Sequence, residues 1–185
     1  MIFLPLILSS GCVSVEKAQQ ALKVCPQYFQ DNIGEAATEP LSPLGVVLRG
    51  RVTYDESRCP IHLYGLFDKN IVWHEAFHSF EMRAHLNRHD EWELFQYDFG
   101  DDIYIGPVVV ATMLFVPFVE QAPIPGRVRL YSSLSKLEDS ADCFMYWMQC
   151  RQGKKVRNDV VLQRKLIAVE KFVTGQYNGD YVGEK

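Results

Sequence analysis

Two histidines and a glutamate are spaced in the sequence so that they could work on one metal ion. They form the pattern His74-Glu75-Ala76-Phe77-His78. On a helix, positions i and i+4 project from the same face one turn apart, so both imidazoles can reach one Zn²⁺. Glu75 would lie beside the open coordination position, where it can take a proton from metal-activated water. The pattern therefore predicts a zinc site that includes a general base.

A catalytic zinc site of this kind needs a third protein ligand. His85 follows His78 by seven residues, a rise of about 10 Å on one helix, so we expect it and His89 to be solvent-exposed. The arrangement HExxHxxGxxH is excluded, because Glu81 and Ala84 replace its glycine and its last histidine. The remaining candidates are carboxylates about sixty residues further along the chain: Glu138, Asp139 and Asp142.

Glu138 and Asp142 are one helical turn apart in the run Leu137-Glu138-Asp139-Ser140-Ala141-Asp142. Together with the HExxH pattern, this run resembles the gluzincins, the metallopeptidases that combine HExxH with a downstream glutamate. The resemblance implies that Glu138 binds zinc. It also implies that Asp142 accepts a hydrogen bond from a ligating histidine, which fixes the tautomer and orientation of that imidazole.

Tyr131 precedes Glu138 by seven residues, as a tyrosine does in the anthrax lethal factor-like branch of the zincin clan. The resemblance, which covers roughly residues 70–150, implies that the Tyr131 hydroxyl donates to the oxyanion that develops during hydrolysis. Packing in the core is the alternative role for this ring. Two positions depart from the branch's pattern: residues 135–137 lack its Asn-Pro, and Ser140 replaces an aromatic residue.

Helices of matching length are expected around these residues. Apolar spacing without Gly or Pro predicts one helix from Ile71 to about His89 and a second from Leu137 to about Arg151. Aromatic residues next to the motifs are expected to fill the core between these helices: Trp73, Phe77, Phe144, Tyr146 and Trp147. Arg127 and Arg129 are expected to be solvated loop charges rather than ligands for a substrate carboxylate.

Other segments complete an α+β fold. We expect an N-terminal helix over residues 15–29, a loop over 31–43, and a terminal helix over 156–173. Two β-like runs, 46–54 and 61–66, predict a hairpin or adjacent strands. The resemblance implies a zincin-like domain, in which the small sheet packs on the HExxH helix, the second helix carries Glu138, and the first β-like run offers an edge to an extended peptide. The apolar stretch 103–119 is broken by Gly and Pro and is expected to be core or cleft wall.

Length and composition indicate one globular domain. The chain has 185 residues, 48% of them hydrophobic and 23% charged, which excludes disordered and coiled-coil classes. Its formal net charge is −4, the wrong sign for a protein that neutralises phosphates. We therefore expect no nucleic-acid partner.

The N-terminus predicts export. Residues 1–11, MIFLPLILSSG, form an apolar run too short to span a bilayer, and they lead into Cys12 like the end of a bacterial lipoprotein signal peptide. The expected organisation is a signal peptide over 1–11, a single domain over 12–175 and a loosely ordered tail over 176–185. Lipid on Cys12 would attach the protein to a membrane; a frayed apolar N-terminus is the alternative.

The other cysteines leave two possibilities open. Cys143 and Cys150 are seven residues apart on one predicted helix, beyond the reach of a disulfide. Cys25 and Cys59 could pair in an oxidising compartment, or they could be buried free thiols.

The activity expected from these patterns is zinc-dependent hydrolysis of peptide bonds, with one Zn²⁺ per chain and a peptide or protein substrate. The alternative is an exported zinc-binding interaction protein without hydrolytic activity, in which the metal stabilises the fold. Glu75 favours catalysis, because a purely structural site needs no base. A deformylase or amidase is a further alternative, but no cysteine or histidine pair is arranged with the motif in that manner.

Overall fold

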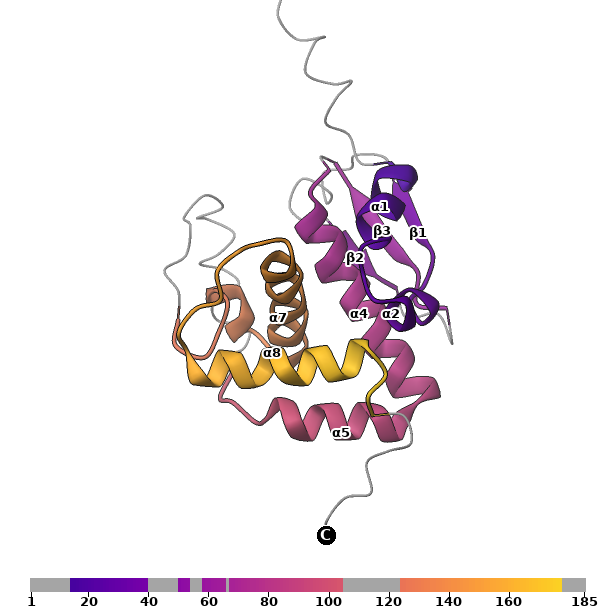
Figure 1. Ribbon diagram of the computed structural model, residues 1–185. Coiled ribbons are helices and arrows are strands. Elements are labelled where there is room, and N and C mark those ends of the chain that lie inside the picture. The colour runs from indigo at the N-terminus through magenta and orange to yellow at the C-terminus, as the bar shows by residue number, and fades with distance from the viewer. Residues whose placement is uncertain (1–13, 40–49, 54–57, 66, 105–123, 178–185) are drawn as a thin grey trace, which may run out of the picture.

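The computed structural model describes residues 14–39, 50–53, 58–65, 67–104 and 124–177 (Figure 1). These residues form an α+β architecture in which helices predominate, as the sequence predicts at this coarse level. The elements follow one another in this order: α1 (Val15–Leu22), α2 (Gln27–Asp31), β1 (Ala36–Glu39), β2 (Gly50–Val52), β3 (Ile61–Tyr64), α4 (Lys69–Asn87), α5 (His89–Phe99), the 3-10 turn η1 (Leu130–Ser133), α7 (Lys136–Arg151) and α8 (Val160–Val173).

The sheet has three short strands in the order β1-β3-β2. Strand β2 pairs antiparallel with β3, which confirms the predicted pairing of the two β-like runs. Strand β1 pairs parallel with β3 and lies in the segment expected to be a loop. Helix α4 packs against β2 and β3, and α1 packs against α4 and β1. The sheet therefore supports the helix that carries the HExxH pattern.

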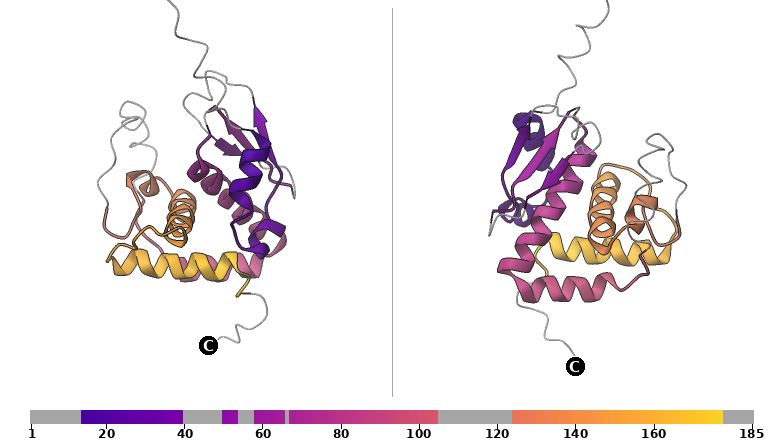
Figure 2. Two further views of the ribbon diagram at one scale, coloured as in Figure 1. Left: turned by 45° about the horizontal axis from the view of Figure 1, so that its top comes forward. Right: turned by 180° about the vertical axis from the view of Figure 1, so that it is seen from behind.

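Helix α4 lies between the sheet and α7 (Figure 1). The side chain of Asp68 caps its first turn by accepting a hydrogen bond from the amide of Asn70. The chain then turns at Arg88 directly into α5, which lies beside α8 along the other end of the molecule (Figure 2). Helix α5 was not predicted. Helices α4, α5, α7 and α8 enclose the main core.

Phenylalanine rings fill this core. The Phe77 ring stacks on Phe144 with centroids 5.1 Å apart, and the Phe95 ring stacks on Phe172 at 4.2 Å. Phe80 contacts Phe172 edge to face at 4.9 Å. The five aromatic residues predicted to be core are all buried: Trp73, Phe77, Phe144, Tyr146 and Trp147. Large buried rings hold α4 and α7 in fixed positions relative to each other.

Some helix boundaries differ from those expected. The predicted helix over 15–29 is two helices: α1 ends at Leu22, and Pro26, which cannot lie inside a helix, precedes the first residue of α2. Helix α8 begins at Val160 rather than at Val156. Asp159 caps this start, because its carboxylate accepts a hydrogen bond from the amide of Leu162. Tyr177, in the segment expected to be loosely ordered, is buried and donates to Asp98.

The cysteines in the described part of the chain are free thiols. Cys25, Cys59 and Cys143 are buried and Cys150 is partly buried. Burial raises the pKa of Cys25 to about 12, which keeps it a thiol. Of the two possibilities left open by the sequence, the structure therefore has the free thiols.

Several expectations concern residues outside those described: the signal peptide over 1–11, Cys12, and residues 105–119 of the apolar stretch. Ile103, at the start of that stretch, is described and exposed. Among the described residues, no helix combines the length and apolarity that crossing a membrane requires.

Candidate metal centre

Two helices bring the three predicted zinc ligands together. Helix α4 presents His74 and His78 from consecutive turns, and the first turn of α7 presents Glu138. The Ser135 side chain caps α7 by accepting a hydrogen bond from the Glu138 amide at 3.2 Å. Glu138 thus lies at the N-terminus of a helix, where the helix dipole favours a carboxylate.

The donor atoms of the three side chains converge on one point. His74 Nε2 lies 3.0 Å from Glu138 Oε2 and 3.1 Å from His78 Nε2. His78 Nε2 lies 3.4 Å from the same Glu138 oxygen. One ligand atom from each residue falls within 4.8 Å of the others. Two imidazole nitrogens and a carboxylate oxygen form the donor set of many catalytic zinc sites, so these residues fit a zinc ion.

The other ring nitrogen of His74 has its own partner. His74 Nδ1 lies 2.9 Å from Asp142 Oδ1, and the Asp142 side chain is fully buried. Asp142 also accepts hydrogen bonds from Ser132 Oγ at 2.8 Å and from the Arg129 guanidinium. An N–H donated to this carboxylate fixes the tautomer that leaves Nε2 free to bind a metal.

These contacts shift the pKa values of the ligands. Burial alone would lower the pKa of His74, but the hydrogen bonds to Asp142 and Glu138 outweigh it and raise that pKa to about 9. Burial would raise the pKa of Glu138, but the hydrogen bonds from His74 and His78 hold it well below its usual range. Glu138 therefore remains a carboxylate, the form that binds a metal.

Glu75 lies beside the ligands and is partly buried. Burial raises the pKa of its carboxyl group, while His74 and His78 oppose that shift. Strand β2 packs directly against it: a Cβ added at Gly50 would lie 2.8 Å from Glu75 Cδ and 2.9 Å from Glu75 Oε1. Gly50 thus leaves room for the Glu75 side chain, a role that the sequence alone did not indicate.

Tyr131 lies on η1 at the same site. Its ring centroid is 5.8 Å from that of His74, and its hydroxyl donates to the Glu138 carboxylate. Burial and the nearby carboxylates raise the pKa of this phenol. Tyr131 is thus a neutral donor beside the ligand atoms, where the resemblance implied that it would lie.

The expectation for Arg127 and Arg129 was wrong. Arg127 is buried and donates to the carbonyl oxygens of Ser132 and Ile103. Arg129 binds Asp142 through two nitrogens. Neither is a solvated loop charge, because buried carboxylates on α7 require cationic partners. Arg129, Ser132 and Gly50 are the residues near the site that sequence reasoning missed.

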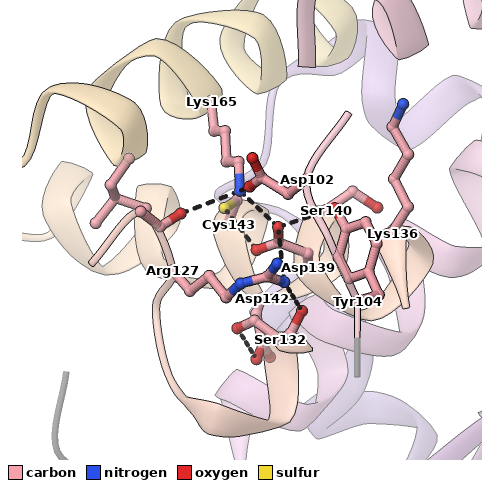
Figure 3. A network of polar contacts seen from close by, with 12 residues as sticks. Asp102, Tyr104, Arg127, Ser132, Lys136, Asp139, Ser140, Asp142, Cys143 and Lys165 are labelled. Atoms are coloured by element: carbon pink, nitrogen blue, oxygen red, sulfur yellow. Dashed lines mark hydrogen bonds and ion pairs between the residues drawn. The ribbon is translucent and has the colours of Figure 1, made fainter. Parts of the chain in front are cut away.

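Asp139 follows Glu138 but belongs to a different group of residues (Figure 3). Its carboxylate lies 2.7 Å from Lys165 Nζ and 3.6 Å from Arg127 Nη1, and it accepts a hydrogen bond from Tyr104. Lys165 also binds Asp102 and the carbonyl oxygen of Gly126. We call this group the buried ion network: Asp102, Tyr104, Arg127, Asp139 and Lys165. Asp139 therefore does not share the metal centre with Glu138.

The remaining histidines of the predicted helix lie away from the metal centre. His85 and His89 are exposed, as predicted. Within the described residues, one other group has metal-ligand spacing: His89, Asp90 and Glu93, all of them exposed. No model of a protein family, curated protein or solved structure matches this chain.

Proposed function

We propose that this protein is a zinc-dependent metallopeptidase with a zincin-like fold. The observation that carries the proposal is the convergence of His74, His78 and Glu138 donor atoms within 4.8 Å, with Glu75 and the Tyr131 hydroxyl beside them. A structural zinc site needs neither a spare carboxylate nor a hydroxyl donor next to the ligands. Both groups are useful for hydrolysis.

His74, His78 and Glu138 would hold the metal. A zinc ion held by these residues would supply Lewis-acid chemistry, polarising the scissile carbonyl and acidifying the attacking water. Glu75 takes the proton of that water as its oxygen bonds to the carbonyl carbon, and then delivers a proton to the leaving amine nitrogen as the C–N bond breaks. Burial raises the pKa of Glu75 in the direction of neutral pH. This shift suits both accepting a proton from water and donating one to the leaving amine.

Two other side chains support this chemistry. Tyr131 donates its O–H to the carbonyl oxygen as negative charge develops there, which stabilises the transition state more than the substrate. Asp142 holds the Nδ1–H of His74, so that the imidazole keeps its orientation while charge moves through the site.

The substrate that we propose is an extended peptide. Among the described strands, β2 is at an edge of the sheet in the order β1-β3-β2, and its Gly50 lies against the Glu75 side chain. A peptide that pairs with this edge would pass next to the general base.

Export and lipid attachment at Cys12 remain part of the proposal. The mature chain should lack residues 1–11, and mass spectrometry of natively expressed protein should find Cys12 at its N-terminus, with or without acyl chains. An intact Met1 would contradict export.

The test compares wild type with Glu75→Gln. We expect about one zinc per chain in both proteins by elemental analysis, and less in His78→Ala. In a cleavage screen on proteome-derived peptides, wild type should cut and Glu75→Gln should be slower by roughly 10²- to 10⁴-fold. Bound zinc without cleavage by wild type would favour the alternative of a zinc-binding interaction protein. Equal cleavage by Glu75→Gln would overturn the mechanism.

A further inference from the structure

We infer that Arg129 is a positioning residue that links two parts of the candidate metal centre. One part is the His74–Asp142 pair and the other is Tyr131. The inference rests on the proposed function, because it assigns a role within that same site. It comes from three contacts of one guanidinium group with Asp142 and Tyr131.

The first two contacts form a bidentate ion pair. Arg129 Nε lies 2.7 Å from Asp142 Oδ2, and Arg129 Nη2 lies 2.6 Å from Asp142 Oδ1. The same Oδ1 faces His74 Nδ1 at 2.9 Å. A planar fork that holds both oxygens of a carboxylate fixes the rotation of that carboxylate as well as its position. Arg129 therefore fixes the direction in which Asp142 holds the His74 imidazole.

The third contact is with Tyr131. The guanidinium carbon lies 5.0 Å from the centroid of the Tyr131 ring, within the range of a cation–π contact. That ring places its hydroxyl on Glu138. The single group that orients a ligand through Asp142 thus also packs against the side chain proposed to bind the oxyanion.

The contacts of Arg129 differ from those of Arg127, two residues earlier in the chain. Arg127 binds the carbonyl oxygens of Ser132 and Ile103 and approaches Asp139, so it serves the buried ion network. Arg129 is partly exposed, with 37% of its side chain accessible, and its carboxylate partner touches a proposed metal ligand. Loss of the Arg129 guanidinium should therefore lower zinc affinity more than it lowers the free energy of unfolding.

Zinc affinity is the first measurement, because it does not depend on finding a substrate. Arg129→Met keeps the length of the side chain and removes the fork; we expect zinc binding, measured by competition with a chelator, to weaken roughly tenfold. Arg129→Lys keeps the charge but not the bidentate geometry, so its affinity should fall between those of wild type and Arg129→Met.

Arg151→Met is the matched control. Arg151 lies at the other end of α7, where its guanidinium covers the Trp147 ring at 4.8 Å from the centroid. It has the same kind of aromatic contact, far from the proposed ligands along the helix. We expect this variant to bind zinc as wild type does.

Turnover of a cleaved peptide at saturating zinc separates the effect of Arg129 on Tyr131 from its effect on zinc binding through Asp142 and His74. Arg129→Met should lower kcat more than it changes KM. In a Tyr131→Phe background the same substitution should have a smaller effect on kcat, because the hydroxyl that it helps to place is already gone.

The outcomes distinguish this inference from the proposed function. Zinc affinity in Arg129→Met equal to that of wild type, or lowered to the same extent in Arg151→Met, would overturn the inference. Equal kcat effects in the two Tyr131 backgrounds would overturn the coupling to Tyr131. A wild-type protein that binds zinc but cleaves no peptide would defeat the proposed function, while the zinc measurements would still decide how Arg129 acts on His74.

Discussion

Glu138 and Asp139 are neighbours in the first turn of α7, yet they belong to two regions with opposite properties. Glu138 is itself partly exposed and faces the imidazoles of His74 and His78, and the hydrogen bonds from them lower its pKa. Asp139 is fully buried among the cations of the ion network, and burial raises its pKa despite those cations. Adjacent residues of α7 are thus a carboxylate proposed to bind a metal ion and a carboxylate that joins helices through ion pairs.

The difference teaches that partners and exposure, rather than residue type or helix position, separate a functional carboxylate from a structural one. A metal ligand has to remain reachable and to give up its contacts with other side chains when the ion binds. A buried ion pair has to keep its contacts at all times, because an unpaired buried charge is costly.

The largest effect expected is on zinc affinity. Glu138→Gln removes one of three proposed ligands, and zinc binding should weaken by roughly 10²- to 10⁴-fold, about a third of the free energy typical of a protein zinc site. Asp139→Asn should leave the affinity of the folded protein unchanged. Competition with a chelator measures both. Loss of zinc in Asp139→Asn with retention in Glu138→Gln would reverse the assignment of the two regions.

Stability should respond in the opposite order. Asp139→Asn removes the buried partner of Lys165, and we expect the free energy of unfolding to fall by about 3 kcal/mol. Glu138→Gln should lower it by less than Asp139→Asn does in zinc-free protein, because the Glu138 side chain is partly exposed and solvent screens its contacts with His74 and His78. Urea denaturation in the presence of a chelator measures this difference. Equal destabilisation by the two substitutions would remove the contrast between the regions.

Tyr131→Phe tests the metal centre alone. The variant loses one hydroxyl beside Glu138 and no part of the buried ion network. We expect kcat to fall by about 100-fold with little change in KM, because the hydrogen bond to the oxyanion forms mainly in the transition state. Steady-state kinetics on a cleaved peptide measure the change. Full activity would limit Tyr131 to packing and leave the zinc site in place.

Glu81 sharpens the comparison because it is a buried carboxylate whose hydrogen-bond partners are neutral. It accepts hydrogen bonds from Ser140 and Gln96, and burial raises its pKa from 4.5 to about 7. The folded protein therefore holds an extra proton between these two pH values, so this group makes stability fall as pH rises through that window.

The matching experiment is denaturation of Glu81→Gln at pH 5 and pH 8. The variant has no carboxyl group to ionise, so its stability should fall less than that of wild type between the two pH values, by roughly 2 kcal/mol. Glu170→Gln, on an exposed position of α8, is the control and should behave as wild type does. An unchanged pH dependence in Glu81→Gln would show that Glu81 is not the group that titrates.

The sequence predicted which residues lie together at the candidate metal centre better than it predicted the elements around them. His74 and His78 are close because one helix carries both, so their spacing alone fixes their geometry. Glu138, Asp142 and Tyr131 came from the resemblance, and the structure places them at the same histidines. Their roles remain predictions.

Other features depend on tertiary contacts that spacing does not reveal. Strand β1 has four residues and exists because it pairs with β3, so its own pattern carries little signal. The Arg129–Asp142 pair joins residues thirteen positions apart across a turn. Nothing in an isolated arginine on a predicted loop indicates a buried carboxylate partner.

The buried ion network also has a consequence for how this chain could be altered. Arg127 donates to the carbonyl oxygen of Ile103, and Lys165 joins Asp102 to Gly126, so the chain on either side of residues 105–123 is held at one place. A substitution that removes the ammonium group of Lys165, such as Lys165→Met, should therefore loosen both described ends at once, residues 102–104 and residues 124–127, because each of them is bound to the same nitrogen.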